Sequence, residues 1–250
     1  MTASERPLAA GNYLEALMGH LELLHRESFD TIEEVATRAA TSIREGGVVH
    51  VFGCGHSQLV AVEASDRAGG LAALHAIVDP ALAPTGGLRS ARTERLPGYG
   101  QVVLEAEDLR PGEVLIVVSN SGMNPVPIDV ARGAAEQGMF VVAVTSRAHS
   151  DAVASRHPSG LRLHEVAHVT IDTGAPIGDA ALHLPDGTGV GPLSTVLASA
   201  AVHAVMVTAA EQLAATGDEV PVLVSQNLDG PADPNESVIA RYADRKRGRP

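Results

Sequence analysis

The sequence predicts an α/β fold in which N-terminal helices precede a doubly wound, five-stranded parallel sheet of flavodoxin-like strand order. The main observation is that short apolar runs rich in Val and Ile alternate with longer stretches of helical periodicity. A second observation is that two of these runs end in turns rich in Gly, Ser and Asn, each leading into a helix. Ligands bind such sheets beyond the carboxyl ends of the strands, so both turns lie where a site is expected.

The leading region, residues 8–44, has apolar residues at spacings near three to four, which predicts helix. We expect a break near Phe29 and Asp30, with a second helix that ends before Gly46. Residues 79–110 contain several Pro and Gly and are expected to be irregular. The strands are expected at residues 48–52, 71–78, 114–118, 139–144 and 166–171, and the later helices at residues 58–68, 127–137 and 192–213.

Composition limits the class of protein. A chain of 250 residues that is 45% hydrophobic fits one domain over residues 1–250, with a helical extension at about 8–45 and a basic, solvated tail at about 240–250. A net charge of −12 argues against a nucleic-acid partner. Cys54 is the only cysteine, so no intrachain disulfide forms. Without a signal peptide or a long apolar span, the chain is expected to be cytoplasmic, with no membrane partner.

Lysine usage excludes two large classes of enzyme. Lys246 is the only lysine and lies near the C-terminus. A Walker-A loop needs a lysine directly after its last glycine, and a Schiff-base mechanism needs a buried lysine. The chain is therefore expected to belong to neither class, and no cofactor is required by its motifs.

The two turns, residues 52–57 and 119–125, place hydroxyl groups and free backbone N–H groups at helix N-termini. This chemistry suits a phosphate group, and two such turns suggest one shared site. A dinucleotide fingerprint is the alternative, but Gln58 stands where the third glycine belongs and Asp79 lies too far along for the ribose. A purely structural turn is a further alternative. The expected phosphate-binding residues are Gly55, Ser57, Ser119, Asn120, Ser121, Gly122 and Asn124.

The same two turns resemble the phosphosugar-binding loops of SIS (sugar isomerase) domains, and the strand ending in Thr145-Ser146 agrees with this. More closely, the chain resembles the stand-alone SIS proteins of the UPF0309 type, which share the runs at residues 67–71, 171–176 and 178–181. Two kinds of enzyme resemble these SIS proteins in fold and chemistry: N-acetylglucosamine-6-phosphate dehydratases and N-acetylmuramic acid 6-phosphate etherases. The resemblance covers roughly residues 35–215 and implies a phosphorylated amino sugar as the ligand.

The resemblance also implies a catalytic carboxylate on the helix after the first turn. Glu63 is the expected general base and Asp66 the second choice, three residues further on the same predicted helix face. A surface ion pair between Glu63 and Arg67 is the alternative reading. His56 is expected to act in catalysis, by donating to the phosphate or by helping to open the sugar ring, and the alternative is that it caps the helix. His203 is expected to help open the sugar or, alternatively, to be an ordinary core histidine.

A carboxylate can remove the acidic C2 proton of an open-chain aldose 6-phosphate and form an enolate. Loss of the C3 oxygen then gives β-elimination, whereas reprotonation at C1 gives a ketose. An N-acetyl group on C2 blocks the second route, so the expected activity is that of a lyase, most plausibly acting on N-acetylglucosamine 6-phosphate. An aldose–ketose isomerase and a non-catalytic phosphosugar sensor remain alternatives.

The sequence also bears on metal binding and on the oligomeric state. His164 and His168 bracket a predicted strand, and no His-Glu-x-x-His motif occurs, so no metal is expected. The leading helices have more apolar positions than one buried face needs, which predicts a homodimer or a higher even oligomer. Residues of the partner copy that complete the site are expected within residues 79–110, where Arg89, Arg92, Glu94 and Arg95 cluster. The alternative for this region is a solvated loop.

Overall fold

The structure is a computed structural model that describes residues 9–227 and 234–246. Five parallel strands form the central sheet in the order β2-β1-β3-β4-β5, which confirms the predicted doubly wound, flavodoxin-like arrangement. The strands are β1 (Val49–Gly53), β2 (Leu74–Ile77), β3 (Val114–Val118), β4 (Phe140–Thr145) and β5 (Val169–Asp172).

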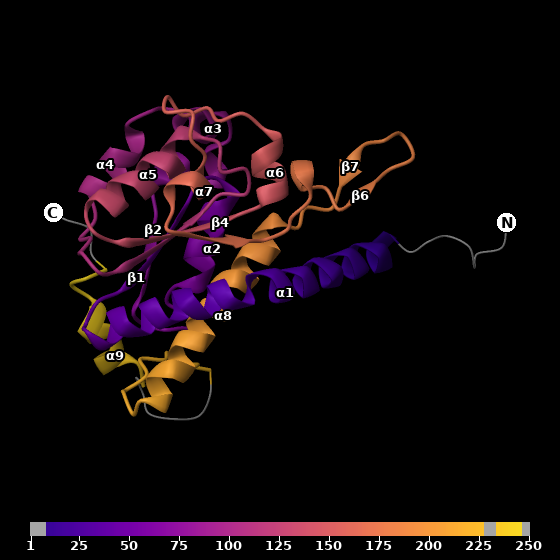
Figure 1. Cartoon of the computed structure of the whole chain (residues 1–250). Coiled ribbons are helices and arrows are strands. Elements are labelled where there is room, and N and C mark those ends of the chain that lie inside the picture. Colours follow the sequence, from indigo (N-terminus) through magenta and orange to yellow (C-terminus); the bar gives the residue numbers. More distant parts are fainter. Residues whose placement is uncertain (1–8, 228–233, 247–250) are drawn as a thin grey trace.

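Helices cover both faces of this sheet (Figure 1). One face packs against α1 (Ala9–Arg44), α2 (His56–Ala64) and α8 (Ser194–Ala215), and the other packs against α4 (Tyr99–Glu105), α5 (Pro125–Glu136) and α7 (Leu163–Val166). Strand β3 contributes apolar side chains to both faces, because successive side chains of a strand point to opposite sides. Val114 and Ile116 lie in the core on the α1 side, whereas Leu115 and Val117 lie in the core on the α5 side. Both faces are apolar, as expected for buried parallel strands.

Helix α1 is continuous, so the break expected near Phe29 and Asp30 is wrong. No proline occurs between residues 9 and 44, and Asp30 is exposed and therefore costs the helix little. Buried side chains continue on both sides of the expected break, at Leu24 and Ile32, because the helix packs along α8. Tertiary packing thus outweighs the local capping signal.

The segment expected to be irregular, residues 79–110, contains four short helices: η1 (Pro80–Leu82), η2 (Pro84–Gly86), α3 (Leu88–Thr93) and α4. Asp79 starts the segment by accepting a hydrogen bond from the Ala81 N–H at 2.7 Å. Its other carboxylate oxygen accepts from the Tyr99 hydroxyl at 2.8 Å, which ties the start of the segment to the start of α4. Proline is compatible with the first turn of a helix, and it stands there in both η1 and η2. The expectation of irregular structure is therefore wrong for these residues.

Smaller elements lie between β4 and α8: α6 (Arg147–Ala152), η3 (Ile177–Asp179), β6 (Leu182–His183) and β7 (Gly189–Val190). The β6–β7 hairpin projects from the body near the N-terminal half of α1 (Figure 1). The Tyr13 hydroxyl donates to the Pro192 carbonyl at 2.8 Å, which joins this half of α1 to the segment that precedes α8. A small third core of Ala175, Leu193 and Leu197 packs against Tyr13 and its neighbours on this half of α1.

The C-terminal segment is folded against the sheet and is not a solvated tail, so that expectation is wrong for residues 241–246. Helix α9 (Glu236–Tyr242) leads to Arg245, which is 8% exposed because it forms ion pairs with Glu113 and Asp108. Lys246 pairs with Asp66. Residues 247–250 lie outside the described residues.

Helix α8 is long and apolar enough to span a membrane by length and composition alone. Its Ala201, Val202 and Val205 are fully buried, and it packs against both α1 and α2. These contacts are those of a core helix, which passes the same test of length and hydropathy.

Candidate functional site

The two Gly/Ser turns lie side by side at the carboxyl edge of the sheet. The first joins β1 to α2 and the second joins β3 to α5, and β1 and β3 are hydrogen-bonded neighbours with Gly53 opposite Val118. Strand order reverses at this pair, since β2 lies beyond β1 and β4 beyond β3. This is the switch point at which doubly wound sheets bind ligands.

Glycine shapes the first turn at two positions. A Cβ atom on Gly53 would lie 2.5 Å from the Ser57 backbone carbon, so only glycine lets the chain fold back this closely. Gly55 has a φ of 57° and directly precedes α2, and its N–H donates to the Leu82 carbonyl at 2.8 Å. The turn therefore presents Ser57 in the first turn of α2.

The second turn is tied to the end of β4. The Thr145 hydroxyl and the Ser146 N–H both donate to the Asn120 carbonyl, each at 3.1 Å. The Gly122 N–H donates to the Ser119 hydroxyl at 3.2 Å. Within the described residues, the N–H groups of Asn120 and Ser121 donate to no protein acceptor. Fixed, free N–H groups ahead of a helix are suited to an anion.

A small polar cavity lies between these turns and α8. Its polar lining is Ser57, Asn120, Thr173, Ser194 and Thr195. The Oδ1 atom of Asn120 is buried and has no partner among the described residues, so an additional donor would satisfy it. The cavity volume is about 10 Å³, which is room for about one water molecule. A sugar phosphate can enter only if the surrounding segments move apart.

Three of these lining residues were not predicted. Thr173 follows β5, in the stretch that the UPF0309 resemblance had marked but to which no role was given. Ser194 and Thr195 begin α8, and two hydroxyl residues at the start of a long apolar helix were a usable signal. Asp179 holds this helix start, because one of its carboxylate oxygens accepts from the N–H groups of Leu193 and Ser194 at 2.9 and 2.8 Å.

Asn124 is not free to bind phosphate in this structure. It is 9% exposed, its Nδ2 donates to the Glu94 carboxylate, and its Oδ1 accepts from Arg156 at 3.0 Å. Burial raises the pKa of Glu94, with the nearby Arg95 and Arg156 acting in the opposite direction. Asn124 thus holds the start of α5, and with it the end of the second turn, against the 79–110 segment.

Glu63 and His203 meet on neighbouring helices. His203 Nε2 on α8 lies 2.7 Å from Glu63 Oε2 on α2, and Arg67 forms an ion pair with the other carboxylate oxygen. The side chains of Glu63 and His203 are 40% and 36% exposed. Burial, and then the positive charge of Arg67, lower the pKa of His203 below its usual value. A lowered pKa favours the neutral imidazole, and the tautomer that carries its proton on Nε2 can donate to the Glu63 carboxylate.

This pair lies on the same two helices, α2 and α8, that flank the cavity. Val60 of α2 and Ala198 of α8 line the cavity, and Glu63 follows Val60 by one helical turn. From Ser57 to Glu63, the helix rises about 9 Å, at 1.5 Å per residue. That rise is comparable to the distance from phosphorus to C2 in an extended hexose 6-phosphate.

Asp66 and His56 are placed differently from expectation. Helix α2 ends at Ala64, and Asp66 has a φ of 47°, so it does not share a helix face with Glu63. Its carboxylate instead pairs with Lys246. His56 is exposed at the first position of α2, and within the described chain it caps no helix and does not line the cavity.

The histidines considered for metal binding have separate partners. His164 contacts the Ser150 hydroxyl and the Asp151 carboxylate, whereas His168 accepts from the Val141 N–H at 3.0 Å and stacks on Phe140. In the part of the chain that the structure describes, no group of three or more His, Cys, Asp or Glu residues converges on one point.

We predict that Gly122→Ala weakens both the fold and anion binding. Gly122 has a φ of 58°, and a Cβ there would lie 3.2 Å from the hydroxyl oxygens of Thr145 and Ser150. Strain of this kind costs about 1–2 kcal/mol. Thermal unfolding and calorimetric titration with inorganic phosphate measure the two effects. Gly160→Ala, at a φ of 74° with open space around it, is the matched control, and equal losses of phosphate binding in both variants would contradict the prediction.

Comparison with known proteins places the chain in a family. Residues 12–146 match the model of the SIS domain, so the chain belongs to the SIS-domain family. UPF0309 proteins match along nearly the whole chain, and the chain is one of this group. The relative from Listeria monocytogenes is 37% identical over 94% of this chain and 96% of its own, and that from Geobacillus kaustophilus is 38% identical over 93% and 94%.

A solved structure agrees on the fold. A phosphoheptose isomerase from Francisella tularensis superposes with a TM-score of 0.53 at 15% identity, covering 84% of this chain and all of that one. This superposition confirms the SIS-domain fold that the two turns predict.

Proposed function

We propose that this chain is a phosphosugar lyase that eliminates water from an amino-sugar 6-phosphate, most plausibly N-acetylglucosamine 6-phosphate. The observation that carries the proposal is the Glu63–His203 pair, which lies on α2 and α8, the two helices that also line the polar cavity between the turns. The free N–H groups of the second turn and the hydroxyl of Ser57 would bind the phosphate. This remote contact would hold the reacting carbons beside Glu63.

In the proposed reaction, the ionised carboxylate of Glu63 removes the C2 proton of the open-chain sugar. The electrons of the C–H bond pass to the carbonyl oxygen as an enolate. Collapse of the enolate forms the C2–C3 double bond and breaks the C3–O bond. The departing hydroxide takes the proton that Glu63 carries and leaves as water, which restores the carboxylate. The neutral His203 holds Glu63 through its Nε2–H and is placed to assist this proton transfer. The net change is loss of one water molecule.

The test is incubation with N-acetylglucosamine 6-phosphate, followed by absorbance of the unsaturated product. Glucosamine 6-phosphate and hexose 6-phosphates are assayed in parallel for ketose formation. Ketose formation without elimination favours the isomerase alternative, which uses the same Glu63. Binding of these sugars without any turnover would support a phosphosugar sensor and contradict both enzymatic proposals.

We further propose that the protein is a homodimer. Leu14 and Met18 are each 55% exposed and Phe29 is 44% exposed on α1, which gives the helix an apolar stripe outside the core. The N-terminal half of α1 also projects from the body with the β6–β7 hairpin (Figure 1). A second copy of the chain is the proposed partner for this stripe.

The dimer predicts a solution mass of twice 25.8 kDa, and Met18→Glu is expected to reduce it to that of one chain. A charge at the centre of an apolar interface has no partner there and costs several kcal/mol. Light scattering measures the mass, and Glu34→Gln, at an exposed position on the same helix, is the control. A wild-type mass near one chain would contradict the proposal.

A further inference from the structure

A second cavity lies far from the two turns, at the opposite edge of the sheet. Its volume is about 490 Å³, which lies within the range of small-molecule sites. It lies between the segment that follows α2, residues 223–227, and α9 with the segment after it. Asp66, Arg67 and Lys246 supply its charged groups, and Leu223, Ile239 and Ala243 supply apolar wall.

The walls of this cavity are fixed by specific contacts. The Leu223 N–H donates to the Gly70 carbonyl at 2.9 Å, and the Gly69 N–H donates to the Leu223 carbonyl at 2.7 Å. Asn235 binds the backbone of Val224 through both its amide atoms, each at 2.9 Å. The cavity is therefore a built feature of the fold.

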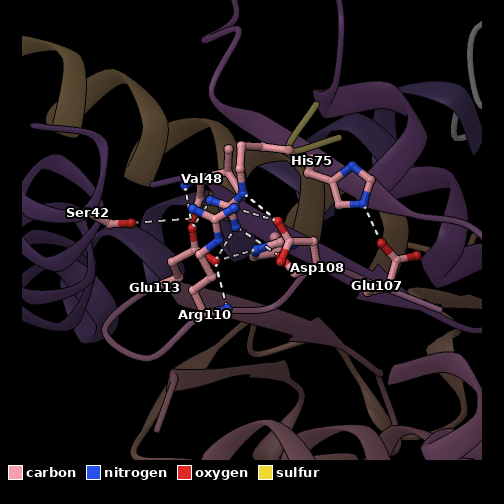
Figure 2. A network of polar contacts seen from close by, with 9 residues as sticks. Ser42, Val48, His75, Glu107, Asp108, Arg110 and Glu113 are labelled. Atoms are coloured by element: carbon pink, nitrogen blue, oxygen red, sulfur yellow. Dashed lines mark hydrogen bonds and ion pairs between the residues drawn. The ribbon is translucent and has the colours of Figure 1, made fainter. Parts of the chain in front are cut away.

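Lys246 is held in place by its neighbour Arg245. Glu113 lies in a buried polar network (Figure 2), and it accepts from Arg245 Nη1 at 2.8 Å and from Arg245 Nη2 at 3.0 Å. Arg245 also donates to the Asp108 side chain and carbonyl, each at 2.9 Å. This anchor places the only lysine of the chain against Asp66, with its Nζ 3.5 Å from the Ala72 carbonyl.

Hydrogen-bond donors exceed acceptors at the charged end of the cavity. Arg67 has five N–H donors, and in the described part of the chain its guanidinium pairs only with Glu63. Lys246 has three donors, of which Asp66 and the Ala72 carbonyl take two. A planar guanidinium and an ammonium group with unused donors are the pair that proteins use for carboxylates and phosphates.

We propose that this cavity binds a small hydroxylated molecule that carries a phosphate or carboxylate group, held by Arg67 and Lys246. The two cations would contact the oxyanion. Ser225 and Gln226, which also line the cavity, offer groups for hydroxyls. The ligand is thus an effector at a site separate from the phosphosugar cradle.

Arg67 links the effector site to Glu63, and this part of the inference rests on the proposed function. Arg67 lines the cavity, and its guanidinium pairs with the Glu63 carboxylate that faces His203. An oxyanion in the cavity competes with Glu63 for Arg67. Occupancy would therefore free the carboxylate from its cation and make it a stronger base.

Two variants of one ion pair test the binding site. Lys246→Met removes a cation from the cavity, whereas Asp66→Asn removes the competing anion, and both break the same exposed contact. Calorimetric titration with inorganic phosphate, and with acetate as the carboxylate probe, is expected to show about fivefold weaker binding in Lys246→Met and about threefold tighter binding in Asp66→Asn. Equal effects of the two variants, or none, would overturn the proposal.

A crystal soaked with tungstate, as a heavy phosphate analogue, separates this site from the cradle. The proposal expects one anomalous peak between Arg67 and Lys246 that is lost in Lys246→Met. A second peak at Ser121 reports on the cradle, which Lys246→Met leaves unchanged. Peaks at the cradle alone contradict the effector site, and a peak in this cavity alone contradicts the phosphate cradle while supporting the effector site.

Discussion

Glu63→Gln is expected to lower the kcat for elimination from N-acetylglucosamine 6-phosphate by about 10²–10⁴, the range for loss of a general base. Glutamine keeps the size of the side chain and a hydrogen bond to His203, but it cannot accept the C2 proton. The KM is expected to change little because the phosphate contacts lie about two helical turns away. Initial rates of product absorbance measure both constants.

The same variant has a second readout that is independent of the elimination step. In D₂O, the wild-type protein is expected to exchange the C2 hydrogen of the substrate for deuterium, because the enolate can be reprotonated. Glu63→Gln should abolish this exchange, as seen by proton NMR. Glu211→Gln, an exposed glutamate on α8, is the matched control and should retain both activities. Unchanged exchange in Glu63→Gln would remove Glu63 from the mechanism.

His203→Asn separates positioning from proton abstraction. Asparagine can still donate to Glu63, whereas His203→Ala leaves the carboxylate with Arg67 as its sole protein partner among the described residues. If His203 only orients Glu63, asparagine preserves most of the deuterium exchange. If His203 also moves a proton, exchange persists in the asparagine variant and elimination is lost.

The parts of the fold that were predicted correctly depend on local signals. Strand β3 was recognised as residues 114–118 because five apolar residues lie between polar turns. Helix α5 was recognised from its prolines and from Gly138 beyond its end. The two turns were recognised from their own residues. In each case, the residues that determine the structure are close together in the sequence.

The parts that failed depend on contacts between distant residues. Arg245 was assigned to a solvated tail because its partner Glu113 is 132 positions away. Asn124 was assigned to the phosphate because nothing near it in the sequence indicates Glu94, 30 positions earlier. Thr173 and Thr195 line the cavity with Ser57 only after the chain has folded. The pairing of Glu63 with His203 was not foreseen either, although both residues were singled out separately.

Glu113→Gln is expected to destabilise the protein by about 3–5 kcal/mol, the largest effect on stability that we predict. Glu113 is 4% exposed and accepts from the backbone N–H groups of Val48 and Arg110 (Figure 2). It also contacts His50 and accepts from Arg245. Glutamine replaces one acceptor with a donor and leaves Arg245 without its buried counter-charge. Chemical denaturation at pH 7 measures the change.

A double-variant cycle assigns the loss to the ion pair. Arg245→Met alone leaves the Glu113 charge uncompensated, so it should destabilise by a similar amount. The double variant should lose less than the sum of the two single variants. Arg241→Met, at the exposed pair with Glu219, is the control and should cost less than about 1 kcal/mol. Additive losses in the cycle would show that the two groups act independently.

The pH dependence of the Glu113→Gln effect supplies an independent check. Burial alone would raise the pKa of Glu113, but hydrogen bonds from His50 and Val48 and the charge of Arg245 outweigh it, so the pKa lies below 4.5. A carboxyl with a lowered pKa in the folded state contributes its stability above pH 4.5 and loses it as the pH falls through the folded pKa. The stability difference between wild type and Glu113→Gln should therefore be constant near neutral pH and shrink below pH 4.5. A difference that grows in acid would mean that Glu113 is protonated in the native protein, and the buried network would then be held by neutral hydrogen bonds.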